Sequence, residues 1–204
     1  PLFNLQISSD GSPQLGYESL SWNLGPEAWL HPGELVTLEI PVWDKNGVTD
    51  INNIDLDLSF NQPDDSTISW SREGNYCESS TLYISVQSCR IDSDSEQNLF
   101  SSSGKFVIEF VLEWGFDPDD SIDRNVRIYI EDLNGQSSQL VLNELVWRFS
   151  GEMDIDRETL SFLVGDEIIT GDANWIQPRE NVNVVGEIKW TKTQRSVNQP
   201  LDPV

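Results

Sequence analysis

Apolar and polar residues alternate along five stretches of the chain, and this alternation predicts β-strands. In the first stretch, ELVTLEIPVW, single polar residues separate Val36, Leu38 and Ile40. A period of two places neighbouring side chains on opposite faces, so each strand is expected to bury one face and expose the other. The five stretches are residues 34–43, 54–60, 105–114, 125–131 and 138–148. Weaker patterns predict strands at 17–22, 67–71 and 81–87.

Turn-forming clusters separate these stretches and complete the prediction of an all-β fold. DKNG, NQPDDS, SSSG, DPDDS and DLNG each lie between two strand patterns, and no stretch has a convincing helical period. Seven or more short strands at this spacing are typical of an antiparallel, immunoglobulin-like β-sandwich. We expect that sandwich to occupy residues 17–150, with residues 1–16 as a linker or the last strand of a preceding module.

An internal repeat predicts the start of a second module. WLHPGELVTL at residues 29–38 returns as WIQPRENVNV at 175–184, and ESLSW at 18–22 returns as ETLSF at 158–162. Residues 151–204 are therefore expected to be a linker and an incomplete second immunoglobulin-like module. Such a piece is too short to bury a core alone. We favour a fragment of a longer tandem array; the alternative is a module that a strand from another chain completes.

The charge and hydropathy of the chain argue against nucleic acid as a partner and against a membrane span. Thirty-five acidic residues against 12 basic ones give a net charge of −23. Such a chain repels nucleic acid, and no run of about 18 apolar residues is present to span a membrane. The acidic residues are spread along the sequence, which is compatible with solubility, with adaptation to salt water and with attraction of divalent cations.

The two cysteines, Cys77 and Cys89, predict a disulfide and an extracellular location. Both lie in a strand-like stretch, where a hairpin would bring them together. The alternative is a pair of buried free thiols. A zinc site is not expected, because two cysteines and one histidine are too few and wrongly spaced. The histidine, His31, lies in a Pro-Gly turn, where we expect it to be exposed.

The sequence does not predict an enzyme. A single histidine leaves no Ser-His-Asp or Cys-His arrangement, and no glycine-rich phosphate loop is present. Paired carboxylates could act on a glycoside, yet no acidic residue is marked out from the others.

Two similar loops form a candidate calcium site. DKNGVTD follows the strand at 34–43, and DLNG follows the strand at 125–131. If these strands take the roles B and F of an immunoglobulin-like sandwich, both loops lie at the same end of it. Their oxygen-bearing side chains would then converge as calcium ligands. Plain turns are the alternative, and no cofactor is required for folding. The candidate ligands are Asp44, Asn46, Asp50, Asp132 and Asn134.

Carbohydrate binding is a second candidate function. Trp70, Tyr76 and Tyr83 flank the cysteine region, where exposed aromatic rings would serve as stacking platforms for sugars.

The stretch WLHPGELVTLEIPVWDKNG resembles the first strands of CARDB-type immunoglobulin-like domains of prokaryotic surface proteins. The resemblance implies repeated sandwich modules in a secreted or cell-surface protein, and it does not by itself imply an activity. From the sequence as a whole we expect a structural or adhesive function in a tandem array, surface layer or filament. The expected partners are neighbouring modules, copies of the same chain or surface glycans. The matching residues are Pro32, Gly33, Glu34, Val36, Leu38, Ile40, Val42, Asn46 and Gly47.

Overall fold

A computed structural model gives the fold of the chain. It describes residues 14–15, 21–22, 29–59, 66–93, 102–116, 123–164, 167–169, 182–194 and 196–197. Over these ranges the secondary structure is β-strand, apart from a single 3-10 turn at Val48–Asp50. The predicted all-β class is confirmed. The chain divides into two compact units, Pro1–Ser150 and Gly151–Val204.

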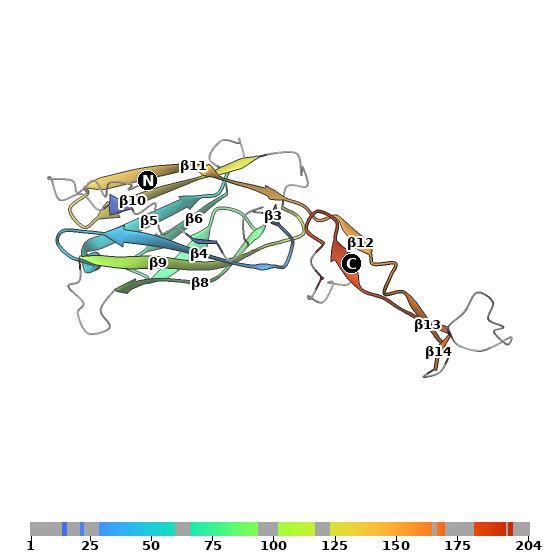
Figure 1. Cartoon of the computed structure of the whole chain (residues 1–204). Coiled ribbons are helices and arrows are strands. Elements are labelled where there is room, and N and C mark those ends of the chain that lie inside the picture. The colour runs from blue at the N-terminus through green and yellow to red at the C-terminus, as the bar shows by residue number, and fades with distance from the viewer. Residues whose placement is uncertain are drawn as a thin grey trace. The chain divides into compact units, whose positions relative to one another are not determined.

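Two sheets form the first unit, and Figure 1 shows them as two layers. One sheet has the order β1, β4, β9, β8, and β2 also pairs with β4. Its strands are β1 (Gln14–Leu15), β2 (Ser21–Trp22), β4 (Leu35–Trp43), β8 (Ile84–Ser93) and β9 (Ser103–Leu112). The other sheet has the order β3, β11, β10, β5, β6, β7. Its strands are β3 (Trp29–Leu30), β5 (Ile51–Asp57), β6 (Thr67–Ser71), β7 (Tyr76–Ser79), β10 (Arg124–Asp132) and β11 (Ser137–Phe149).

The strand order is that of an immunoglobulin sandwich of the variable type. In that topology strands B, E and D share one sheet, and strands G, F, C, C′ and C″ share the other. Here β4, β9 and β8 follow the first order, and β11, β10, β5, β6 and β7 follow the second. β3 pairs with β11 in parallel, and the other described pairs are antiparallel. The loops after β4 and β10 therefore occupy the B–C and F–G positions.

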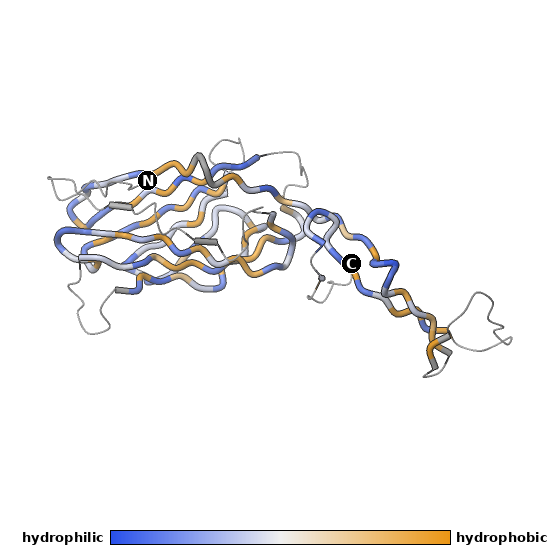
Figure 2. The backbone as a smooth tube through the Cα atoms, viewed as in Figure 1, coloured by the Kyte–Doolittle hydropathy of each residue, from blue (hydrophilic) through white to orange (hydrophobic). Residues whose placement is uncertain are grey.

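The core lies between the two sheets and follows the predicted alternation. Along β4 the residues alternate between buried and less buried, and Figure 2 shows the matching alternation of hydropathy. Trp147 is fully buried, and its Nε1 donates a hydrogen bond of 2.7 Å to the carbonyl of Leu58. The guanidinium of Arg124 lies 5.7 and 5.4 Å from the centres of two buried rings, those of Phe116 and Trp147. Trp147 and Arg124 are thus matched by an acceptor and by aromatic rings, whereas Nε1 of the buried Trp70 has no hydrogen-bond partner among the described residues.

Most predicted strands are present, with shifted ends. β9 ends at Leu112, so Trp114 lies in the following turn and is 43% exposed instead of facing the core. The strand predicted at 81–87 begins only at Ile84, because the hydroxyls of Ser79 and Thr81 accept backbone hydrogen bonds that form turns before it.

The prediction that His31 is an exposed turn residue is wrong. His31 is fully buried, and its Nδ1 donates a hydrogen bond of 2.6 Å to the carbonyl of Ser150. The cause is the short parallel pairing of β3 with the end of β11, where Leu30 lies opposite Phe149. This pairing places the turn that follows β3 against the end of β11.

The disulfide between Cys77 and Cys89 is confirmed, but the hairpin expected to carry it is not. Cys77 lies on β7, at the edge of one sheet, and Cys89 lies on β8, at the edge of the other. The bond therefore joins the two sheets along one side of the sandwich. Every cysteine in the chain is engaged in it.

The described residues of the second unit form two small antiparallel sheets. In one, β12 (Met153–Ile155) pairs with β16 (Ile188–Trp190). In the other, β13 (Ser161–Val164) lies between β14 (Glu167–Ile169) and β15 (Val182–Val185). Several of its apolar side chains are exposed, among them Phe162, Ile168 and Val184.

Candidate metal centre

The two Asp-x-Asn-Gly loops converge at one end of the first unit. One follows β4, the other connects β10 to β11, and β10 pairs with β5 so that Asp132 lies opposite Ile51. The amide of Leu133 donates a hydrogen bond of 2.8 Å to the carbonyl of Asp50. The loops are thus joined directly through their main chains.

The two loops have the same local hydrogen bonds. Oδ1 of Asp44 accepts from the amide of Asn46 at 2.7 Å, and Oδ1 of Asp132 accepts from the amide of Asn134 at 2.8 Å. In each loop the glycine amide then donates to the aspartate carbonyl at 3.1 Å. Gly47 and Gly135 have φ angles of 108° and 77°, a conformation that favours glycine.

The second oxygen of each aspartate is buried and has no hydrogen-bond partner. Asp44 is 0% exposed and Asp132 is 1% exposed, and Oδ2 of both is unpaired. A buried polar atom without a partner costs about 1–3 kcal/mol, and more when it is charged. Turn formation explains the Oδ1 atoms, but it leaves these two oxygens unexplained.

Asp50 adds a third carboxylate. One oxygen from each of Asp44, Asp50 and Asp132 lies within 4.8 Å of the other two. The side-chain amides of Asn46 and Asn134 donate to Oδ2 of Asp50 at 3.3 and 3.2 Å. The structure therefore brings together all five residues that the sequence singled out. The side-chain nitrogens of Asn46 and Asn134 hold Asp50 in place at this end of the unit.

The cluster is electrostatically strained. Burial is the largest cause of a raised pKa at Asp44, and the charges of Asp50 and Asp132 raise this pKa further, against hydrogen bonds from Asn46 and Gly47 that lower it. Nearby, the guanidinium of Arg72 donates a hydrogen bond of 2.8 Å to the carbonyl of Val48. Burial lowers the pKa of Arg72, and the charge of Asp50 opposes that change.

The donor set suits a hard divalent cation. Carboxylate oxygens are the ligands that calcium and magnesium prefer, and this cluster has neither a nitrogen nor a sulfur ligand. The twelve-residue loop of EF-hand proteins is absent, so water or main-chain oxygens would supply the remaining ligands. The two unpaired oxygens are the feature of this site that a cation would satisfy.

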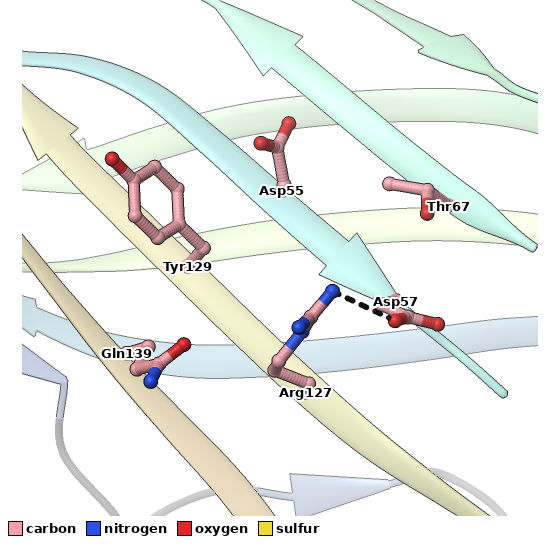
Figure 3. A pocket seen from close by; sticks show the side chains of 6 residues that line it. All are labelled: Asp55, Asp57, Thr67, Arg127, Tyr129 and Gln139. Atoms are coloured by element: carbon pink, nitrogen blue, oxygen red, sulfur yellow. Dashed lines mark hydrogen bonds and ion pairs between the residues drawn. The ribbon is translucent and has the colours of Figure 1, made fainter. Parts of the chain in front are cut away.

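A second polar site lies on the outer face of one sheet. It is a hollow of about 380 Å³ over β5, β6, β10 and β11, and Figure 3 shows the side chains that line it. Arg127 and Asp57 form an ion pair of 3.1 Å along its floor. These residues occupy the polar positions of the strand patterns, so the sequence alone gives no signal that distinguishes them from a solvated surface. Its lining residues are Asp55, Asp57, Thr67, Arg127, Tyr129 and Gln139.

The three aromatic residues proposed for sugar stacking do not form one platform. Trp70 is only 4% exposed, because its ring packs in the core 6.1 Å from that of Phe106. It cannot stack on a ligand from solvent, so that prediction is wrong. Tyr76 and Tyr83 are 48% and 50% exposed, on β7 and in the turn before β8.

Comparisons with known proteins do not place the chain in a family. No family model and no curated protein matches it. Two solved structures are similar in outline. One is a DUF4466 family protein from Parabacteroides merdae, with 8% identity and a TM-score of 0.37 over 76% of this chain and 49% of that one. The other is the major pilin subunit of Bacillus cereus, with 9% identity and a TM-score of 0.36 over 88% of this chain and 59% of that one. These likenesses are too weak to assign a function.

Within the described residues, no helix is long and apolar enough to cross a membrane.

Proposed function

We propose that the first unit is a calcium-binding structural module of a secreted or cell-surface protein. The observation that carries the proposal is the pair of buried, unpaired oxygens of Asp44 and Asp132, which lie beside a third carboxylate. Three ionised carboxylates this close repel one another strongly. A divalent cation would offset that repulsion and supply the missing partner of each oxygen. Protonation of Asp44 is the competing way to relieve it.

Coordination geometry favours calcium over magnesium. Two oxygens on one calcium ion lie up to about 5 Å apart, and the three carboxylate oxygens lie within 4.8 Å of one another. Magnesium demands near-ideal octahedral geometry, which two separate turns are poorly suited to supply. Calcium also accepts irregular coordination, as expected for a site built from two separate turns.

The proposed role of the ion is mechanical. It would join the loop after β4 to the loop after β10, at one end of the sandwich, while the Cys77–Cys89 bond joins the two sheets along one side. Extracellular calcium is abundant enough for modules that bind it with dissociation constants of about 10⁻⁴–10⁻³ M. The disulfide supports the same setting. Such a module suits a surface array or filament, in which stiff units contact their neighbours.

Calorimetric titration of calcium into the metal-free chain tests the proposal. We expect binding in the wild type, at least tenfold weaker binding in Asp132→Asn, and unchanged binding in Asp92→Asn. Asp92 is a matched control because it is an exposed acidic residue on β8, paired with Arg90. Absence of calcium binding to the wild type at millimolar concentration would contradict the proposal, as would an equal loss in the two variants.

Carbohydrate binding is a second candidate, favoured by the hollow on the outer sheet face. There the ring of Tyr129 lies among hydrogen-bonding groups of Asp55, Arg127 and Gln139 (Figure 3). An aromatic ring surrounded by such groups is suited to neutral sugars. A glycan array probed with wild type and Tyr129→Ala tests it. Glycan signals that the variant loses would support this site, and an array without signals would exclude it for the glycans displayed.

A further inference from the structure

Asp50 is the one carboxylate of the cluster that an Asp-x-Asn-Gly turn does not place. It ends the 3-10 turn Val48–Asp50 between β4 and β5, and it is half-buried. Inside the turn, the amide of Asp50 donates to the carbonyl of Gly47 at 2.8 Å, and the amide of Ile51 donates to the carbonyl of Val48. A 3-10 turn this short has few hydrogen bonds and poor hydrogen-bond geometry. The position of Asp50 therefore depends on groups from outside the turn.

Arg72, directly after β6, supplies such a group. Its Nε donates to the carbonyl of Ile51, and a terminal nitrogen donates at 2.8 Å to the carbonyl of Val48. The amide of Arg72 donates at 2.9 Å to the carbonyl of Asn52, which places this residue beside the start of β5. One planar guanidinium thus holds the main chain on both sides of Asp50.

The side chain of Arg72 is anchored by the core and does not occupy the carboxylates. Its guanidinium lies 5.9 Å from the centre of the ring of Trp70, and that ring packs against Phe106. Within the described residues, its donors bind the main chain of the turn and form no ion pair with Asp50. An arginine bound to that carboxylate would compete with a cation for the same oxygens. Arg72 instead holds the turn and leaves the oxygens to the cluster.

Resting on the proposed calcium site, we infer that Arg72 is the positioning residue that fixes Asp50 and sets the preference of the site for calcium over magnesium. Selectivity between these ions depends on cavity size, ligand number and flexibility. A turn held at two carbonyls keeps Asp50 at the irregular geometry of the two loops. A released turn is free to rearrange toward the octahedral geometry that magnesium demands.

Calorimetric titration of calcium and of magnesium into Arg72→Lys tests the inference. Lysine keeps the positive charge but replaces the planar fork with a single ammonium on a flexible stem. We expect the calcium dissociation constant to rise at least fivefold and the ratio of calcium to magnesium affinity to fall at least threefold. A purely structural role would lower the urea midpoint and leave that ratio unchanged. Arg90→Lys is the matched control, because Arg90 also donates through its Nε but lies on β8, paired with Asp92.

A second measurement follows the position of Asp50 without any metal. The amide of Leu133 donates to the carbonyl of Asp50 at 2.8 Å, so its hydrogen exchange reports whether the turn stays in place. In the calcium-free Arg72→Lys chain this amide should exchange at least tenfold faster than in the wild type. The amides of β9 should keep their wild-type rates, which would show that the variant is folded.

The two measurements separate failure of the inference from failure of the calcium site. If the wild type binds calcium and Arg72→Lys keeps both the affinity and the ion preference, the inference is overturned and the proposed function stands. Unchanged exchange at Leu133 would also overturn it, because Asp50 would then be held without Arg72. A wild type that binds no calcium would refute the proposed function, and with it the role in ion preference, whatever the exchange at Leu133 shows.

Discussion

Replacing Asp44 with Asn should stabilise the calcium-free chain and destabilise the calcium-loaded one relative to the wild type. In the calcium-free protein the buried carboxylate of Asp44 repels those of Asp50 and Asp132. The oxygens lie within 4.8 Å of one another, and at that separation and an effective dielectric constant of about 20 each repulsion amounts to about 3.5 kcal/mol. Asparagine removes the charge and keeps an Oδ1 that still accepts from the amide of Asn46.

Opposing effects reduce the gain. A hydrogen bond to a neutral oxygen is weaker than one to a charged oxygen by about 1 kcal/mol, and solvent around the half-buried Asp50 screens one repulsion. A net stabilisation of about 2 kcal/mol is therefore expected without calcium. With calcium at a hundred times its dissociation constant, binding stabilises the wild type by about 2.7 kcal/mol. The variant loses most of that term, so the order of stability should reverse.

Urea unfolding, followed by tryptophan fluorescence, to which the buried Trp70 and Trp147 of the first unit contribute, measures both free energies. Each protein would be unfolded in chelated buffer and in excess calcium, with Asp92→Asn as the control for loss of one acidic charge. Asp44→Asn less stable than wild type in chelated buffer would refute the electrostatic reasoning. Calcium that shifts neither curve would refute the metal site.

The remaining predictions concern pH, the disulfide and the core. The pKa of Asp44 is raised in the folded chain, so its contribution to the stability of the calcium-free protein is complete below the ordinary aspartate pKa and is lost as the pH rises through the raised pKa. Urea midpoints measured across acid pH should fall in the same way as the pH rises. The Asp44→Asn variant should show a smaller fall. Replacing both Cys77 and Cys89 with serine should cost about 3 kcal/mol, because the bond closes a short loop, and a reducing agent should affect the wild type alone in urea unfolding. Trp147→Phe should cost about 1–3 kcal/mol in the same assay because it leaves the buried carbonyl of Leu58 without its donor; an unchanged midpoint would show that another donor replaces it.

The sequence predicted the sandwich and the meeting of the two loops for the same reason. Alternation along ELVTLEIPVW and NVRIYIED identifies the strands, and the strand order places the loops that follow them at one end. The local sequence of the loops then identifies the candidate ligands, because Asp-x-Asn-Gly places a carboxylate at the same point of each turn. Asp50 was predicted on less evidence, since it belongs to the 3-10 turn between β4 and β5.

Long-range pairing explains most of what the sequence did not predict. The burial of His31 depends on the contact of β3 with the end of β11, 119 positions away. The path of the disulfide between sheets depends on β7 and β8 separating after the turn that joins them, although a hairpin gives the same cysteine spacing. Trp70 lies in a strand with few apolar neighbours in sequence, and only the packing against Phe106 shows that its ring faces inward.

The sequence repeat between residues 29–38 and 175–184 also predicts where calcium should not bind. The position of Asp44 in the first unit corresponds, 146 residues on, to Trp190, which is 1% exposed. The next positions of the loop correspond to Thr191, Lys192 and Thr193, so the carboxylate, the amide and the glycine are all replaced. The second unit therefore lacks this half of the metal site. Among the described residues the acidic cluster of the first unit has no counterpart in the second. If the proposed site is correct, the calcium titration should therefore reach a stoichiometry of about one ion per chain, and two equivalent ions would contradict the assignment of ligands to the loops after β4 and β10.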